Sequence, residues 1–171
     1  KVERATLTGG NSTYMNAVEN EIVAGRSLRP QDYKEFASVI LLDEELAKSL
    51  FDSPEAAVNQ VISVNEFSYR VIGVYTSNEA KTAKAFGIGG LPITTNISLA
   101  ANFNTDEISN IVFRVNDTSL TQTLGPELAR KLTEIAGLQQ GEYQVADATA
   151  AFQEVQQLFG FMTTVISAIA G

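Results

Sequence analysis

The sequence predicts an α+β fold built on a mixed sheet, and three stretches support this. The first is the aliphatic run Val39–Leu42, which leads directly into a helical pattern. The second is a pair of β-rich runs, 60–64 and 67–74, separated by only two residues. The third is 108–146, where two β-rich runs flank an amphipathic helical pattern. A hairpin and a β-α-β unit in one chain indicate strands and helices packed together, not an all-helical or all-β protein.

The run Val39–Leu42 organises the chain. It does not alternate with polar residues, which predicts a strand buried on both faces. Asp43 follows as a candidate helix cap, and Glu44 and Glu45 place negative charge in the first helical turn. The apolar residues of the following helix recur at helical spacing and are Leu46, Ala47, Leu50 and Phe51.

Short elements are expected before this strand. Glycine at position 25 is expected to have a positive φ, and Pro30 suits a turn or the first position of a helix. The other expected elements are a strand over Val2–Leu7, a turn over Gly9–Ser12, a short helix over Tyr14–Val18 and a loop over Gly25–Asp32.

Further elements are expected after it. The spacer Asn65-Glu66 predicts a tight hairpin with a positive φ at Asn65, and Gly73 in the second strand indicates a bulge or a close backbone approach. Ile93–Phe103 fits either a strand or a helix. The remaining elements are strands over Ile108–Val115 and Glu142–Ala146, with a helix over Leu120–Ala136 capped by Gly137 between them.

The composition argues against several functions. The net charge of −8 disfavours nucleic acid as a partner, because phosphate is repelled. The chain has no cysteine and no histidine, so thiolate chemistry and the commonest general base are absent. The glycine loop 86–92 lacks the Lys-Ser/Thr ending of a phosphate loop. Arg26 and Asp32 are expected to brace a loop rather than bind substrate. We therefore expect no enzyme, no cofactor and no metal site.

The order of these motifs resembles the periplasmic core domain of MacB-like ABC transporter permeases, in the wider FtsX and LolC/LolE group. The resemblance covers roughly 1–171 and is strongest over 11–75. Asn59 stands where the family usually has glycine, and asparagine tolerates positive φ better than most residues. The residues that carry the resemblance are Gly25, Arg26, Leu28 and Asp32, the strand 39–42 followed by Asp43, Leu50 with Phe51, and Val71–Val74 with Gly73.

The resemblance implies a two-subdomain domain with a C-terminal stem helix. Residues 1–107 would form an inserted mixed α/β subdomain and 108–150 a porter-like β-α-β subdomain. Residues 151–171 would form the stem and the start of a membrane span. The uncharged stretch 158–171 places apolar residues all around a helix, as expected in lipid.

The implied role is mechanical. The domain would lie on the outer side of the cell membrane and relay ATP-driven change to the export of an antimicrobial, peptide or lipid-like substrate. Its implied partners are a second permease copy, a separate nucleotide-binding subunit and a membrane-fusion or adaptor protein. The alternative is a free-standing cell-surface binding or adhesin-like module, in which 158–171 would be a core helix.

Overall fold

The structure, a computed structural model, describes residues 5–18, 20–85, 89–105, 108, 110–137 and 142–145. The chain divides into two compact units, residues 1–114 and 115–171. In the first unit, the described residues form a mixed sheet with helices; in the second, their main element is one long helix. The predicted stem and span, 151–171, lie outside the described residues, as do residues 86–88 of the glycine loop.

Six strands and seven α-helices are described. The strands are β1 (Thr8–Gly10), β2 (Glu21–Gly25), β3 (Val39–Asp43), β4 (Val61–Val64), β5 (Phe67–Thr76) and β6 (Ile93–Thr95). The helices are α1 (Tyr14–Ala17), α2 (Pro30–Lys34), α3 (Glu44–Phe51), α4 (Pro54–Ala57), α5 (Asn78–Ala85), α6 (Asn96–Phe103) and α7 (Thr121–Ala136), with a 3₁₀ turn at Thr118–Leu120. None of the helices described here combines the length and apolar character needed to cross a membrane.

The sheet has the strand order β1-β6-β3-β5-β2, and β4 pairs with β5 alone. β3 is parallel to β5 and antiparallel to β6, so the sheet is mixed and the predicted α+β class is confirmed. The hairpin β4–β5 turns at Asn65, whose φ is +52°, as predicted.

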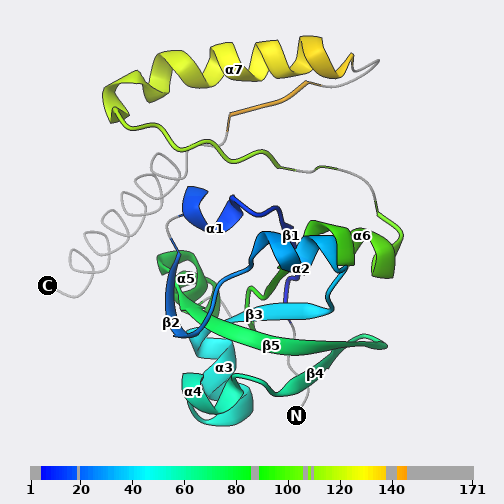
Figure 1. Ribbon diagram of the computed structural model, residues 1–171. Helices are drawn as coiled ribbons and strands as arrows, with labels where there is room; N and C mark the ends of the chain where they lie inside the picture. The colour runs from blue at the N-terminus through cyan, green and yellow to red at the C-terminus, as the bar shows by residue number, and fades with distance from the viewer. Residues whose placement is uncertain are drawn as a thin grey trace, which may run out of the picture. The chain divides into compact units, whose positions relative to one another are not determined.

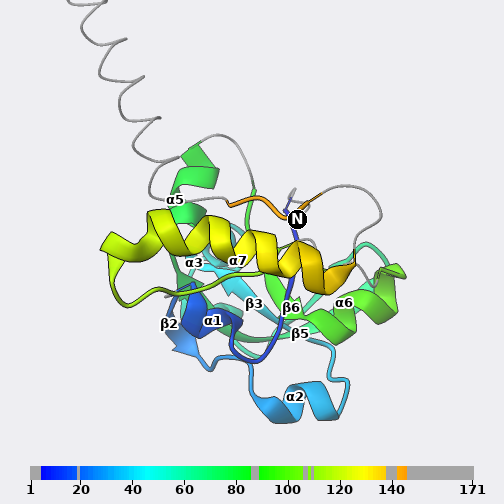
Figure 2. The same ribbon diagram turned by 90° about the horizontal axis from the view of Figure 1, so that it is seen from above.

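Strand β3 is the centre of the first unit, because all five of its residues are buried. Ile40 and Leu42 contribute to one apolar cluster, with α3 and α4, and Leu41 contributes to a second cluster, with α1. Figure 1 shows α3 and α4 below the sheet and α1 and α2 above it, and in Figure 2, seen from above, α1 lies in front of the strands. Burial on both faces explains why the aliphatic run shows no alternation.

The start of the chain differs from the prediction. Of the strand expected over Val2–Leu7, residues 2–4 lie outside the described residues and residues 5–7 are in no strand. The first described strand, β1, instead uses Gly9 and Gly10, which were expected in a turn. The reason is close packing: a Cβ on Gly9 would lie 2.7 Å from the Cδ2 of Leu99 in α6. Gly9 and Gly10 pair with β6, but glycine has a low β-propensity, so the sequence does not predict a strand here.

Strands predicted at 108–115 and 142–146 are also absent from the described residues, since 110–115 and 142–145 are in neither strand nor helix. The expected β-α-β unit is therefore present only in its helix, α7. Ile111, Val112 and Phe113 are consecutive and 41%, 42% and 52% exposed, so no face of this segment is buried as a sheet strand requires.

The structure also decides two segments for which the sequence predicted no single element, 93–103 and 78–85. Residues 93–103 contain both alternatives, since β6 leads directly into α6 through Thr95, whose hydroxyl accepts a hydrogen bond from the Ser98 N–H. The polar segment 78–85 forms α5, which was not predicted because it carries little apolar periodicity.

Candidate functional site

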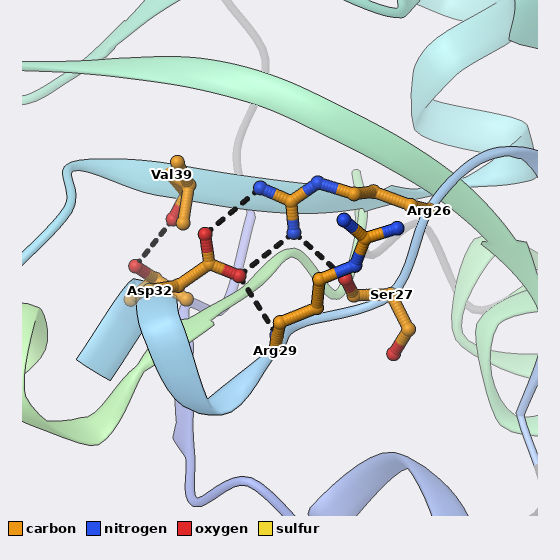
Figure 3. A network of polar contacts seen from close by, with 6 residues as sticks. Arg26, Ser27, Arg29, Asp32 and Val39 are labelled. Atoms are coloured by element: carbon orange, nitrogen blue, oxygen red, sulfur yellow. Dashed lines mark hydrogen bonds and ion pairs between the residues drawn. The ribbon is translucent and has the colours of Figure 1, made fainter. Parts of the chain in front are cut away.

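Four of the residues that carry the resemblance meet where the loop after β2 joins strand β5. Gly25 ends β2 and pairs directly with Gly73 of β5. Arg26 follows Gly25, and its side chain extends to Asp32 in α2 (Figure 3). We call these four residues, Gly25, Arg26, Asp32 and Gly73, the glycine–arginine junction. Two more of the residues that carry the resemblance, Asp43 and Phe51, lie at the two ends of α3.

Neither glycine of the junction leaves room for a side chain. A Cβ on Gly73 would lie 2.3 Å from the carbonyl oxygen of Arg26, and one on Gly25 would lie 2.4 Å from that of Ile72. These neighbours are backbone atoms, which cannot rotate away as a side chain can. Gly25 also has a φ of +71°, a left-handed conformation that favours glycine. The predicted close approach at Gly73 and positive φ at Gly25 are therefore observed.

Strand β5 changes its partner at this point. Its first residues pair with β4 and its last with β2, along the same edge. Ile72 is an extra residue relative to β3, because Ile40 pairs with Val71 and Leu41 with Gly73. The Ile72 carbonyl accepts a hydrogen bond from the Arg26 N–H at 2.9 Å. The bulge thus fastens the loop 26–29 to the centre of the sheet.

Arg26 and Asp32 form a bidentate ion pair. Arg26 Nη1 donates to Asp32 Oδ2 at 2.7 Å and Nη2 donates to Oδ1 at 2.8 Å. Arg26 Nη1 also donates to the Ser27 carbonyl at 3.0 Å. The Asp32 side chain is 8% exposed, so it is largely withdrawn from water. Paired fork geometry of this kind gives both strength and a fixed orientation.

Asp32 also holds the start of α2. Its Oδ2 accepts a hydrogen bond from the Arg29 N–H at 2.7 Å, and Pro30 occupies the first helical position. The Asp32 carbonyl accepts from the Ala37 N–H at 2.9 Å, which fixes the chain leading into β3. Asp32 therefore joins the loop and the helix through its carboxylate, and the approach to the central strand through its backbone carbonyl.

The contacts of the junction shift the pKa values of Asp32 and of the adjacent Tyr33. The hydrogen bond from Arg26, supported by the Arg29 N–H, lowers the pKa of Asp32 below its usual range. Burial, with the nearby Asp32 charge, raises the pKa of Tyr33 to about 12. The Tyr33 hydroxyl donates to the Gly10 carbonyl at 2.8 Å, so it remains a neutral donor that links α2 to β1.

We expect Asp32→Asn to cost about 2 kcal/mol of stability near neutral pH, because it removes charge-assisted hydrogen bonds. A carboxyl whose pKa is lowered by folding stabilises the native state above its unfolded pKa of about 3.9. That stabilisation is lost as the pH falls through the lower folded pKa. Urea unfolding at several pH values should therefore show the wild-type advantage over Asp32→Asn shrinking below about pH 4.

Asp52→Asn is the matched control. Asp52 is exposed, so this substitution removes the same charge at the surface. A wild-type advantage over Asp32→Asn that is independent of pH between neutral and pH 2 would contradict the assigned role of the carboxylate.

Asp43 is a second anchor and is fully buried. Its Oδ1 accepts from the Leu46 N–H at 2.9 Å, which caps α3 as predicted. Its Oδ2 accepts from the Leu91 N–H at 2.7 Å, a contact across 48 residues of sequence. Phe51 ends α3, where it packs against the apolar cluster around Leu42.

Sequence reasoning missed the residues that connect distant segments. Leu91 accepts a hydrogen bond from the Tyr75 hydroxyl, and Asn102 donates to the Tyr69 hydroxyl at 2.7 Å. Asn59, with a φ of +68°, donates its N–H to the Val71 carbonyl at 2.8 Å. Only Asn59 carried a usable signal, namely the tolerance of asparagine for positive φ.

Within the part of the chain that the structure describes, no three acidic side chains come together to hold a metal ion. The junction is a set of structural contacts: it fixes backbone segments to one another, and its charged groups are already paired.

The chain was compared with known proteins. The profile of the MacB-like periplasmic core domain matches residues 1–131. The chain is 26% identical to the uncharacterized ABC transporter permease YknZ of Bacillus subtilis, over 98% of this chain and 41% of that protein. It is 25% identical to the macrolide export ATP-binding/permease protein MacB of Mannheimia succiniciproducens, over 96% of this chain and 25% of that protein. The chain thus spans less than half the length of these relatives.

A solved structure supports the same fold. The extracellular domain of the noncanonic ABC-type transporter YknZ from Gram-positive bacteria superposes with a TM-score of 0.64 at 22% identity. The superposition covers 84% of this chain and 70% of that one. Because the family profile matches well over half of the residues, the chain belongs to the family of MacB-like periplasmic core domains, the extracytoplasmic domains of ABC transporter permeases.

Proposed function

We propose that this chain relays ATP-driven movement to the export of a substrate, as the outer domain of a membrane-bound permease. The observation that carries the proposal is family membership over residues 1–131. The relatives are described as an ABC transporter permease and as a macrolide export ATP-binding/permease protein, which supports a transport role. In this proposal the permease acts as a pair of copies with a nucleotide-binding subunit and an adaptor protein. The substrate is an antimicrobial, a peptide or a lipid-like molecule.

The glycine–arginine junction suits a mechanical role. Movement that enters one element is transmitted only if the neighbouring elements are stiffly joined, because a flexible joint would absorb it. Arg26 is tied to β5 through its backbone and to α2 through its side chain. Asp43 similarly ties β3 and α3 to Leu91. These contacts favour a first unit that moves as one body.

The relay is tested in the full transporter reconstituted in lipid vesicles. Replacing this domain with a short flexible linker is expected to abolish export while ATP hydrolysis by the nucleotide-binding subunit persists. The matched control is the intact transporter carrying Asp52→Asn, a surface change in the same domain. Undiminished export from the transporter that lacks the domain would contradict the proposal.

We also propose that the domain itself is not an enzyme and binds no ATP. Its glycine loop lacks the lysine and hydroxyl residue that hold phosphates, and its net charge is −8. Calorimetric titration of the isolated chain with ATP and Mg²⁺ is expected to give no binding heat. A dissociation constant in the micromolar range would contradict this part of the proposal.

A further inference from the structure

A shallow depression lies beside the glycine–arginine junction. Its volume is about 320 Å³. Six residues line it, and two of them are arginines: Gly25, Arg26, Val58, Asn59, Arg70 and Ile72. None of the six is acidic, so the charged side chains that line this surface are both positive.

Arg70 is available to bind an anion. It lies on β5 between Tyr69 and Val71, which are fully buried, so the alternation of the strand places Arg70 on the outside. Its backbone N–H donates to the Ser38 carbonyl at 3.0 Å. Among the described residues, no ion pair or side-chain hydrogen bond engages its guanidinium. The strand thus holds the backbone of Arg70 in place and leaves its charge exposed.

Among the described residues, one edge of the Arg26 guanidinium has no hydrogen-bond partner, although the end of the group is paired with Asp32. A guanidinium carries five N–H donors. Nη1 uses both of its donors, on Asp32 and Ser27, and Nη2 uses one, on Asp32. Among the residues drawn in Figure 3, none is joined to Nε by a dashed line. Nε and the second donor of Nη2 lie along one edge, and this edge matches the two oxygens of a carboxylate.

The surroundings favour a net positive site. The positive charges of Arg26 and Arg29 both act on Asp32. Arg70 adds a third positive charge to the lining of the depression. The chain as a whole carries a net charge of −8, which repels acidic molecules elsewhere on its surface. An acidic ligand would therefore be attracted to this depression specifically.

We propose that Arg26 and Arg70 form a recognition site for a carboxylate side chain of an acidic segment of a partner protein. The shape selects this kind of ligand. Sites for small molecules usually enclose most of the ligand surface, whereas this depression is open. A glutamate or aspartate presented by a larger molecule needs no enclosure, because contacts outside the depression add to its binding. This binding does not depend on the proposed transport function, because it is a property of the domain alone.

The test is NMR titration of the isolated chain with an acetylated, amidated Glu-rich peptide, following the Nε–H signals of the arginines. Peptide addition is expected to shift the signals of Arg26 and Arg70. Arg70→Gln is expected to weaken binding about threefold to fivefold, in line with exposed ion pairs. Arg70→Lys keeps the positive charge but lacks the forked guanidinium, so its affinity for the peptide is expected to lie between those of the wild type and Arg70→Gln. Arg130→Gln, an exposed arginine of the second unit, is the matched control and should leave binding unchanged.

Three results would overturn the site. The first is the absence of any peptide-dependent shift at Arg26 and Arg70. The second is an equal response to a peptide with glutamine in place of glutamate. The third is a response of these two signals to phosphatidylglycerol vesicles but not to the peptide, which would assign the depression to a lipid phosphate. Failure of this binding leaves the export assay untouched, so the two proposals are tested separately.

Discussion

Gly73→Ala is expected to lower the melting temperature of the chain by on the order of 10 °C. The added Cβ would lie 2.3 Å from the Arg26 carbonyl oxygen and 3.1 Å from that of Ala24. Both are backbone atoms of the neighbouring strand and loop, so relief requires β2 and β5 to separate. We expect a loss of about 3 kcal/mol, at the upper end of overpacking effects. Circular dichroism during thermal unfolding measures it.

Gly137→Ala is the matched control for this substitution. Gly137 ends α7 with a φ of +60°, but a Cβ there would meet no atom within 4 Å. Only the conformational cost of about 1 kcal/mol is expected. Equal effects of the two substitutions would show that Gly73 matters for backbone flexibility alone, and would contradict the close approach at the junction.

Asp43→Ala is expected to destabilise the first unit by about 3 kcal/mol, because it removes a helix cap and leaves the partly buried N–H of Leu91 unpaired. Its two oxygens accept from the N–H groups of Leu46 and Leu91. Asp43→Asn keeps one acceptor oxygen and should lose about half as much. Chemical denaturation of the three proteins measures the series.

Ser53→Ala is the control for the capping contribution alone. Ser53 caps α4 at the surface through an exposed hydrogen bond to the Ala56 N–H. We expect a cost of about 1 kcal/mol. An effect of Asp43→Ala no larger than that of Ser53→Ala would mean that the link to Leu91 adds nothing.

The sequence predicted the local features of the first unit well. Each of these rests on a few neighbouring residues: Asp43 as a cap, the turn at Asn65 and the left-handed backbone at Gly25. Such features follow from steric and hydrogen-bonding preferences that do not depend on distant parts of the chain. The roles of the motif residues in transport remain predictions.

Features that depend on distant partners were beyond the sequence. Strand β1 contains two glycines and forms because β6 and α6 are placed beside it. The strand expected at 108–115 has the right residues, yet no neighbouring strand pairs with it among the described residues. The depression could not be foreseen either, because the bulge at Ile72 brings Arg26 next to a strand that starts 41 residues after it in the chain.

Hydrogen exchange of the Arg26 and Arg29 amides tests the central claim that the loop after β2 is a rigid part of the sheet. Arg26 N–H donates to Ile72, and Arg29 N–H donates to Asp32. Both amides should exchange within about tenfold of the rate of the Val71 amide in the core of β5, as members of one cooperative unit do. Exchange of Arg26 and Arg29 near the rate of an unprotected amide, while Val71 stays protected, would mean that the loop opens on its own and cannot act as a rigid link.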